Sequence, residues 1–273
     1  MGLFTDQKIL TAMCLCLSAA ARAAVGQVPE TSACVILPYE IVELAVPVDG
    51  ILTELSVDRG DRVDASQVVA RLDAAIEDLE IAAALARAGN TAAIAGTQAR
   101  LNFLEAESSR SDELVQRNVA AERSRDEARM DMETARADLE EARLARRIAE
   151  IEARLVETRR DRKTVRSPIS GVVTRREAAA GEFRAAGSAL MTIAWTDVLR
   201  VEAIVDITYH PAIRLGHAVT VVPEAPFDRD YEGEVTVIDQ VFDAATGTFG
   251  LVAVLDNSDA ALPAGLRCRM FFP

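Results

Sequence analysis

The sequence predicts an α+β chain of several domains, in which a long helical hairpin divides a small β-sandwich and a further β-rich region follows. Two segments, residues 47–72 and 168–193, align without a gap at an offset of 121 residues. Between them lies a proline-free insert, residues 73–163, composed mostly of good helix formers. Neither short β segment can bury an apolar face alone, so we expect the two copies to face each other as one domain.

The two β segments share their turns as well as their strands. Each begins with a Pro-x-x-Gly turn, at Pro47 and Pro168, that leads into a short strand rich in β-branched residues. A Gly-Asp or Gly-Glu turn follows at Gly60 and Gly181, and a second apolar strand closes each copy. The shared order of turns and strands predicts the same supersecondary structure in both copies.

The insert is expected to form two antiparallel helices of about 44 residues, each on the order of 66 Å long. Its charge pattern breaks over residues 117–121, where Asn118 can adopt the left-handed conformation that ends a helix. Gly89 and Gly96 weaken the first arm by about 1 kcal/mol each relative to alanine, and they permit bending there.

Apolar residues at alternating spacings of three and four predict a seam along each arm. The first-arm anchors are Ile76, Leu79, Ala83, Leu101 and Leu104. In the second arm, a run of Ala128, Met132, Ala135, Leu139 and Ala142 resumes after a phase slip as Leu144, Ile148, Ile151, Leu155 and Thr158. The many alanines favour close antiparallel packing of the two arms.

Composition and charge narrow the classes of partner. The formal net charge is -13, so the surface repels phosphate backbones, and nucleic acid is excluded as a partner. Only 4% of the residues are aromatic. That composition suits long packed helices better than a large ligand-binding cleft.

The first 23 residues are predicted to be a signal peptide. Lys8 precedes an apolar run over residues 9–21, and Ala21-Arg22-Ala23 has the small-x-small pattern of a cleavage site. The run falls short of the roughly 20 residues that a membrane-spanning helix needs. We therefore expect export.

Export removes Cys14 and Cys16 and leaves Cys34 and Cys268. In an oxidising compartment these two cysteines can form a disulfide between the ends of the mature chain, provided that their Cα atoms approach within about 7 Å. Two buried free thiols are the alternative.

A β-sandwich interrupted by a helical hairpin and followed by β strands resembles the periplasmic adaptor subunits of bacterial tripartite efflux and secretion pumps, also called membrane fusion or HlyD-like proteins. The most specific stretches are residues 46–73 and 165–195, including the Arg-Ser-Pro-Ile-Ser-Gly run at 166–171. The strand and turn pattern of residues 199–265 is similar to the β-barrel domain of that family.

The resemblance implies an elongated, multidomain α+β fold. It consists of a split lipoyl-like β-sandwich, a long antiparallel coiled-coil α-hairpin and a small β-barrel domain. The expected boundaries are 1–23 for the signal peptide, 24–45 for an N-terminal strand segment, 46–72 plus 165–193 for the lipoyl-like domain, 73–164 for the hairpin and 194–273 for the barrel.

The resemblance also implies a binding site at the hairpin tip. Adaptors that dock onto TolC-type outer-membrane channels carry Arg, Leu, Ser and Asp there at fixed spacings, and this chain has Arg110, Leu114, Ala121 and Asp126 at the matching positions. Arginine can bond channel oxygens in bidentate fashion, and leucine supplies an apolar contact. Alanine in place of the serine removes one hydroxyl.

The implied function is a periplasmic adaptor that links an inner-membrane transporter of RND or ABC type to a TolC-type channel and self-associates into a ring. It needs no cofactor and catalyses no reaction. About ten residues separate the signal peptide from the first β segment, so we expect no full membrane-proximal domain. Contact with the transporter would then fall to the barrel or to a further subunit, and the protein would be associated with the inner membrane through the transporter.

Four alternatives were weighed against the adaptor. A biotin or lipoate carrier needs an exposed lysine at the hairpin between its half-motifs, whereas this chain has only Lys8 and Lys163. An enzyme is disfavoured because the two histidines, His210 and His217, have no triad or zinc-ligand pattern around them. A periplasmic coiled-coil scaffold without a transport role explains the insert but not the matched β segments.

A soft-metal site is the remaining alternative, because methionine thioethers bind copper and silver. The four candidate residues are dispersed along the sequence, and the first two do not share a helix face. They are Met130, Met132, Met191 and Met270. We expect them to be packing residues.

Overall fold

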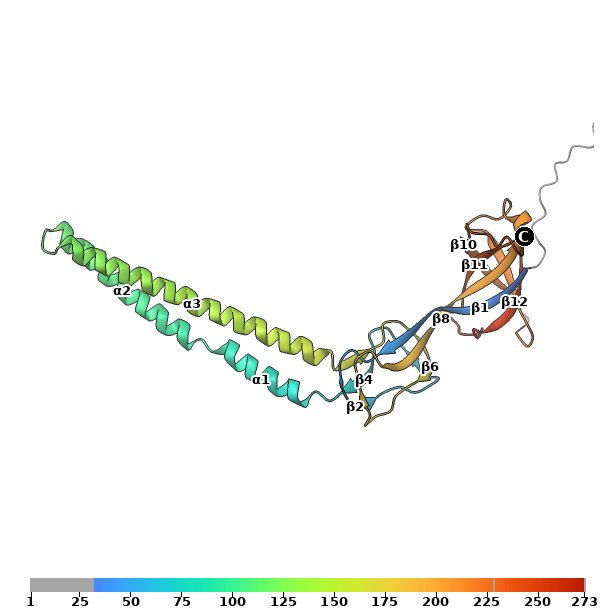
Figure 1. Ribbon diagram of the computed structural model, residues 1–273, viewed down its shortest axis with the longest axis horizontal. Coiled ribbons are helices and arrows are strands. Elements are labelled where there is room, and N and C mark those ends of the chain that lie inside the picture. The colour runs from blue at the N-terminus through green and yellow to red at the C-terminus, as the bar shows by residue number, and fades with distance from the viewer. Residues whose placement is uncertain (1–31, 228, 273) are drawn as a thin grey trace, which may run out of the picture. The chain divides into compact units, whose positions relative to one another are not determined.

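The computed structural model describes residues 32–227 and 229–272, which form two compact units (Figure 1). One unit contains the described residues up to Val42 and those from Ile193 onward, and the other is Glu43–Thr192. The predicted signal peptide lies outside the described residues.

The strands of the Glu43–Thr192 unit repeat at the predicted offset. β2 is Gly50–Leu55 and β6 is Gly171–Arg176, and β3 is Arg62–Val63 and β7 is Phe183–Arg184. β4, Val68–Leu72, corresponds in the same way to the first five residues of β8, Ala189–Asp206. β5, Thr164–Arg166, follows the helical insert. The predicted repeat is therefore confirmed strand by strand.

Each half of the repeat pairs with the other half. β2 pairs with β7, with Gly50 opposite Arg184, and β3 pairs with β6, with Val63 opposite Gly171. The two pairs are related by the repeat. Gly171 is the counterpart of Gly50, and Val63 is the counterpart of Arg184, each at an offset of 121 residues. Neither half closes its own sheet, so both are needed to bury the shared core.

The backbone hydrogen bonds between the halves obey the same relation. The amide of Leu52 donates to the carbonyl of Glu182 over 2.9 Å, and the amide of its counterpart Val173 donates to Asp61 over 2.9 Å. The core that these bonds enclose includes Leu52, Val63, Val69, Leu72, Val173, Leu190 and Met191.

The turns repeat in conformation. Gly60 and Gly181 have φ values of 96° and 90°, as the predicted Gly-Asp and Gly-Glu turns require. At the next pair of corresponding turns, Gly187 has φ 81° but its counterpart is Ser66, at φ 68°. A serine side chain is strained in this left-handed region.

The insert forms a helical hairpin, as predicted, but with three helices rather than two (Figure 1). α1 is Ala75–Gly89, α2 is Ala92–Gln116 and α3 is Glu122–Asp161. The first arm is interrupted because Asn90 is extended, with ψ 110°, and its side-chain oxygen accepts the amide of Ala92 at the start of α2 over 3.0 Å. Gly96, the other glycine at which bending was expected, lies within α2.

The predicted seam of the first arm is wrong over α1 and correct over α2. Ile76 and Leu79 are 71% and 74% exposed, whereas Ala84 and Ala88 pack against Ala153 of α3. In α2, Leu101 and Leu104 pack against Ala135 and Leu139 as expected. Small residues permit the close approach of α1 to α3, so the larger apolar side chains are left on the outer face.

The predicted phase slip in the second arm is also wrong. The seam of α3 continues in one phase through Ala135, Leu139, Ala142, Ala149 and Ala153. Leu144, Ile148, Ile151 and Leu155 instead form a second apolar stripe that stays about half-exposed. Both sets recur at spacings of three and four. The prediction took the larger side chains as the seam, whereas the set that contains the alanines forms it.

In its described part, the other unit contains six strands in a closed order. β1 (Ser32–Ala45), β12 (Leu266–Phe271), β9 (Ala218–Pro223), β10 (Tyr231–Ile238), β11 (Thr248–Asp256) and β8 are hydrogen-bonded in turn, and β1 also pairs with β8. β11 alternates buried and partly buried side chains along its length. A short 3₁₀ helix, Ile207–Tyr209, follows β8.

Two features fasten this unit. Cys34 and Cys268 lie opposite each other on β1 and β12 and form a disulfide, with Cα atoms 4.9 Å apart. A bond that closes so long a loop stabilises a protein by about 2–4 kcal/mol. The buried amide of Asn257 donates to Thr196 and Leu262 carbonyls and accepts the Leu262 amide, so it fixes the turn after β11 to β8.

We predict that Ser66→Gly raises the free energy of unfolding by about 0.5–1 kcal/mol, because glycine relieves the left-handed strain. The reciprocal change, Gly187→Ser, should lower the free energy of unfolding by about 1 kcal/mol. A Cβ at position 187 would meet no atom within 4 Å, so steric overlap is absent and backbone strain is the cause. Urea unfolding measures both changes. A loss of stability in Ser66→Gly would contradict the argument.

Candidate partner-binding surfaces

The tip of the hairpin is a tight turn between α2 and α3. Asn118 has φ 57°, which confirms the turn residue predicted from the sequence. The carbonyl of Leu114 accepts the amide of Val119 over 2.9 Å and closes the end of α2. Ala121 is the N-cap of α3, and its side chain cannot cap the helix, so the backbone alone shapes this end of the hairpin.

The four predicted tip residues are all exposed, but they do not form one cluster of interacting side chains. Arg110 pairs with Glu107 of its own helix over 3.0 Å. Asp126 pairs with Arg125 over 3.0 Å and thereby raises the pKa of that guanidinium. Leu114 is nearly half-exposed beside the turn. The structure therefore leaves an apolar side chain and an arginine on α2 and a carboxylate on α3 accessible to a partner.

The sequence reasoning missed the exposure of three apolar residues, one in the turn, one early in α3 and one near the middle of α2. Val119 lies in the turn itself and is 73% exposed, and Phe103 and Met130 are exposed on α2 and α3. An apolar residue in a turn flanked by charged helices is a signal that could have identified Val119. Phe103 is the only aromatic residue of the insert, which could have identified it too.

The seam between α2 and α3 becomes polar toward the tip. Ser108 and Ser111 are buried where Leu101 and Leu104 lie deeper in the hairpin. The hydroxyl of Ser111 is enclosed without a hydrogen-bond partner. Ion pairs between the helices, Arg136 with Glu105 and Arg129 with Asp112, lie along the same stretch. Apolar burial therefore contributes less to this part of the hairpin than to the rest.

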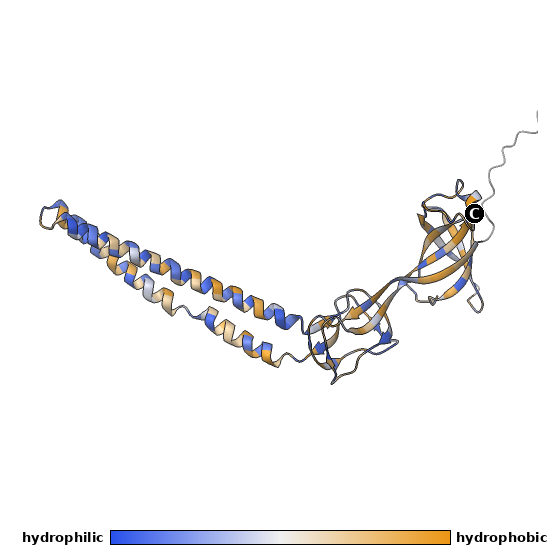
Figure 2. Ribbon diagram, viewed as in Figure 1, coloured by the Kyte–Doolittle hydropathy of each residue, from blue (hydrophilic) through white to orange (hydrophobic). Residues whose placement is uncertain are grey.

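The outer faces of the hairpin carry two apolar stripes. The α3 stripe, Leu144, Ile148, Ile151 and Leu155, lies on the side of that helix opposite its seam. Ile76 and Leu79 likewise lie on the side of α1 that faces away from its seam residues, Ala84 and Ala88. Ala83 and Ala86 extend this stripe along the helix. In Figure 2, hydrophobic stretches recur along the half of α3 nearest the β strands. Neither stripe is covered by any of the described residues, 32–227 and 229–272.

Lys163 has a structural role at the base of the hairpin. Its ammonium group pairs with Glu77 at the start of α1 over 3.1 Å and donates to the carbonyl of Asp49 over 3.2 Å. Arg162 donates to the carbonyl of Pro47 beside it. An amine held between Glu77 of α1 and the turn before β2 is poorly placed for acylation, which disfavours the carrier interpretation.

The exposed side chains of Ile51, Ile76 and Phe183 surround this base, where a cavity of about 260 Å³ opens next to Lys163. The region adds an apolar edge to the β part of the Glu43–Thr192 unit.

Most of the residues that could have served catalysis or metal binding pack within the fold. His217 accepts the backbone amide of Arg214, and His210 packs edge-on against Phe242 and Phe249. Over residues 32–227 and 229–272, no three His, Cys, Asp or Glu side chains gather as metal ligands would. Met191 and Met270 are buried and Met132 packs in the hairpin seam, as expected of packing residues, but the expectation is wrong for Met130, which is exposed. Within the same ranges, every helix is too short or too polar to cross a membrane.

Comparison with known proteins identifies the central part of the chain. Residues 40–196, more than half of the sequence, match the family model of the RND MFP barrel-sandwich hybrid domain, where MFP stands for membrane fusion protein. The nodulation protein NolF of Rhizobium meliloti (strain 1021) is 27% identical over 230 residues, which are 84% of this chain and 59% of NolF. The chain thus spans about three fifths of that relative's length.

Solved structures share the fold. MacA from Actinobacillus actinomycetemcomitans aligns with a TM-score of 0.68 and 17% identity, over 89% of this chain and 77% of MacA. The membrane fusion protein Spr0693 from Streptococcus pneumoniae R6 aligns with a TM-score of 0.61 and 17% identity, over 89% of this chain and 98% of Spr0693. At these identities the likeness concerns the fold alone.

We predict that Ser111→Ala stabilises the hairpin by about 1 kcal/mol, because it removes an enclosed hydroxyl that has no partner. Ser109→Ala is the control, since Ser109 is exposed on the same helix and reports helix propensity alone. Thermal unfolding followed by circular dichroism at the helix band measures both. Equal shifts in the two variants would show that the buried hydroxyl has no specific cost.

Proposed function

The chain belongs to the RND-type membrane fusion proteins, the family of periplasmic adaptors of efflux and secretion systems, and from that premise we propose that it links an inner-membrane transporter to an outer-membrane channel. Its function is to position other proteins, without a chemical step. The transporter is of RND or ABC type, and the RND family match favours the first. The protein acts in the periplasm and is held at the inner membrane by the transporter.

The observation that carries this proposal is the interrupted repeat. Two β halves exchange strands to form one domain, and the chain leaves that domain between β4 and β5 to build the hairpin. Leu72 and Lys163, at the two ends of this excursion, are joined by a backbone hydrogen bond of 2.8 Å. A closed base supports a protruding arm of about 60 Å, estimated from the 40 residues of α3.

We assign the domains as the sequence predicts. The signal peptide is 1–23 and an N-terminal strand segment is 24–45, and residues 46–72 plus 165–193 form a lipoyl-like β-sandwich. Residues 73–164 form a coiled-coil hairpin, for which the regular seam of α3 is the support. Residues 194–273 form a small β-barrel, supported by the closed strand order. The barrel contacts the transporter.

The hairpin tip docks onto a TolC-type channel. Arg110 and Leu114 present a guanidinium group and an apolar side chain on α2, and Asp126 presents a carboxylate on α3. Ala121 fills the position of the family serine, so the hydroxyl contact is absent and the apolar side chain of Val119 extends the contact surface instead. Exposed apolar residues ringed by charges are typical of protein interfaces.

Copies of the chain associate side by side into a ring that encloses a duct. The two outer stripes support this arrangement, because one lies behind α1 and the other behind α3, so each copy offers a different apolar face on either side. Such a head-to-tail interface generates a ring when its rotation closes.

We expect deletion of the gene to abolish export by the partner transporter, measured as substrate efflux and as susceptibility. In a complemented strain, Leu114→Asp should reduce export about tenfold, because a charge in an apolar contact of this kind costs on the order of 1–2 kcal/mol. Asn102→Asp is the control, since it adds the same charge to the same helix away from the turn. Unchanged export in the deletion strain would favour a scaffold without a transport role.

The ring predicts an intermolecular disulfide between Ala86→Cys on one copy and Ile151→Cys on the next. In the hairpin, Ala84 and Ala88 lie level with Ala153, so the two new cysteines are level with each other on opposite outer faces. The two cysteines of one chain cannot form a disulfide with each other, because they face away from each other. A disulfide-linked dimer therefore indicates that the outer faces of neighbouring copies meet. Ile151→Cys with Asn102→Cys, at a different level, should give no cross-link. Equal yields for both pairs would contradict the ring.

A further inference from the structure

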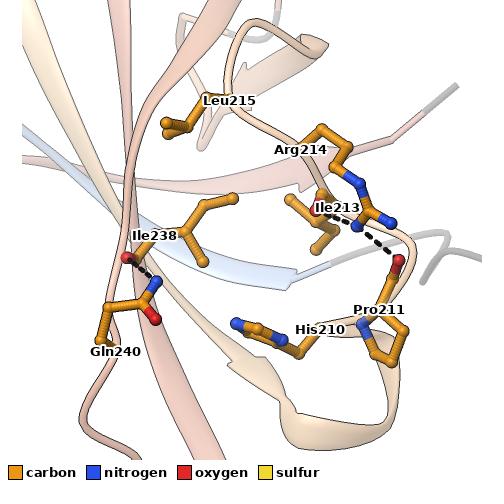
Figure 3. Close-up of a pocket in the computed structure, with 7 residues that line it drawn as sticks. All are labelled: His210, Pro211, Ile213, Arg214, Leu215, Ile238 and Gln240. Atoms are coloured by element: carbon orange, nitrogen blue, oxygen red, sulfur yellow. Dashed lines mark hydrogen bonds between the residues drawn. The ribbon is translucent and has the colours of Figure 1, made fainter.

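The unit that contains Ile193–Phe272 has a cavity of about 660 Å³ at one end of its strands (Figure 3). Its apolar walls come from Pro211, Ile213, Leu215 and Ile238. His210 and Gln240 contribute polar groups, and Figure 3 shows the imidazole ring lying below Ile213 and Ile238. The volume falls within the range of roughly 300–1,000 Å³ that accommodates a ligand or a bulky partner side chain.

His210 brings an unused hydrogen-bonding group into this cavity. Its Nε2 atom is enclosed and has no partner. The ring is held by Phe242 and Phe249, with centroids 4.9 Å and 5.1 Å away in edge-on contacts. A buried polar atom without a partner is costly, and binding of a group that can pair with it removes that cost.

The loop that carries the cavity is held in a fixed shape. The guanidinium group of Arg214 donates to the carbonyl of Ile213 over 2.9 Å and to that of Pro211. The backbone amide of Arg214 donates to His217. Both guanidinium bonds are made by Nη1 of Arg214, and they fix the position of that group. The apolar walls, His210 and Gln240 are the other groups that line the cavity.

The apolar surface extends beyond the cavity. Val241 is 85% exposed, and Leu215, Ile207 and Phe242 are exposed beside it. Phe242 contacts His210, and Ile207 bonds to Gly247 of the loop that carries Val241 and Phe242, so these side chains share one end of the unit. Contiguous exposed apolar surface of this kind marks a site for a macromolecule rather than for a small ligand.

Aspartates flank the residues of this surface along the chain. Asp206 precedes Ile207, Asp239 follows Ile238, and Asp243 follows Phe242. A hydrogen bond from the hydroxyl of Thr208 lowers the pKa of Asp206, and hydrogen bonds led by the amide of Ala245 lower the pKa of Asp243. Both groups therefore remain charged to lower pH than ordinary aspartates. An occupant with Lys or Arg around an apolar side chain complements these carboxylates.

We propose that this cavity is the socket by which the chain docks onto the periplasmic face of the inner-membrane transporter, and that it receives an apolar side chain of the transporter flanked by basic residues. The inference rests on the proposed adaptor function. A second copy of the chain fits less well, because the chain carries a net charge of -13 and would bring a mainly acidic surface to the flanking aspartates. The occupant also pairs with the free nitrogen of His210.

The test is photo-cross-linking in cells with p-benzoylphenylalanine in place of Val241. The expected product is a covalent complex with an integral inner-membrane transporter, identified by mass spectrometry. Val241 directly follows the lining residue Gln240, so the cross-linker lies beside the cavity. The matched control is the same substitution at Ile204, which is 68% exposed within β8 and has no lining residue next to it. It should give no such product.

Two further variants in the Val241 background test the socket itself. Leu215→Asp should reduce the cross-link about tenfold, whereas Leu215→Met, which keeps an apolar wall, should retain it. His210→Phe keeps the ring packing but removes the nitrogen, and it should reduce the cross-link by about threefold to tenfold. Equal yields in all three variants would contradict docking through the cavity.

A separate cross-linker in place of Val119 at the hairpin tip distinguishes the two proposals. If the tip captures an outer-membrane channel while position 241 captures nothing, a soluble protein or a second copy of the chain, the socket is refuted and the adaptor function stands. If neither position captures a membrane protein, both proposals fail.

Discussion

The exchange of strands between the two β halves is the constraint on which the Glu43–Thr192 unit depends. β2 pairs with β7 and β3 pairs with β6, so each half completes the sheet of the other. A chain that has made the first half must return to make the second, whatever it builds in between. The backbone bond between Leu72 and Lys163, together with the Lys163 to Glu77 pair, holds the two ends of the insert together. The hairpin is thereby fixed at its base.

Packing within the hairpin follows from that fixed base and from residue size. Alanines at the seam let α1 and α3 approach closely, and the larger apolar side chains are consequently left outside. Burial of small residues stabilises a two-helix arm only modestly, since hydrophobic stabilisation scales with the area removed from water. The arm therefore retains apolar surface on both sides, and toward the tip its seam becomes polar at Ser108 and Ser111. These are the properties of a module that is completed by its partners.

The other unit is stabilised differently. Its core is larger than the apolar clusters of the hairpin seam. The disulfide between Cys34 and Cys268 and the buried amide of Asn257 also join strands and turns that are far apart in the sequence. A firmly closed set of strands can carry an irregular loop region at one end without losing its shape. There the cavity beside His210 combines apolar walls with an unpaired nitrogen, and aspartates flank the neighbouring segments along the chain. We expect this end of the unit to form a specific contact because its polar and apolar groups are held in place before any partner arrives.

The sequence by itself determined the repeat, its offset, the presence of the hairpin and the left-handed turn at Asn118, because these depend on local turn chemistry and on the register of short strands. It did not determine which apolar stripe of α3 forms the seam, since Ala149 and Ala153 and the stripe of Leu144 and Ile148 have the same helical spacing. Only the close approach of α1 decided between them. The cavity around His210 likewise required the tertiary structure, because it depends on groups brought together from separate elements. The break at Asn90 is instead local, since its side chain bonds the amide of Ala92 two residues on.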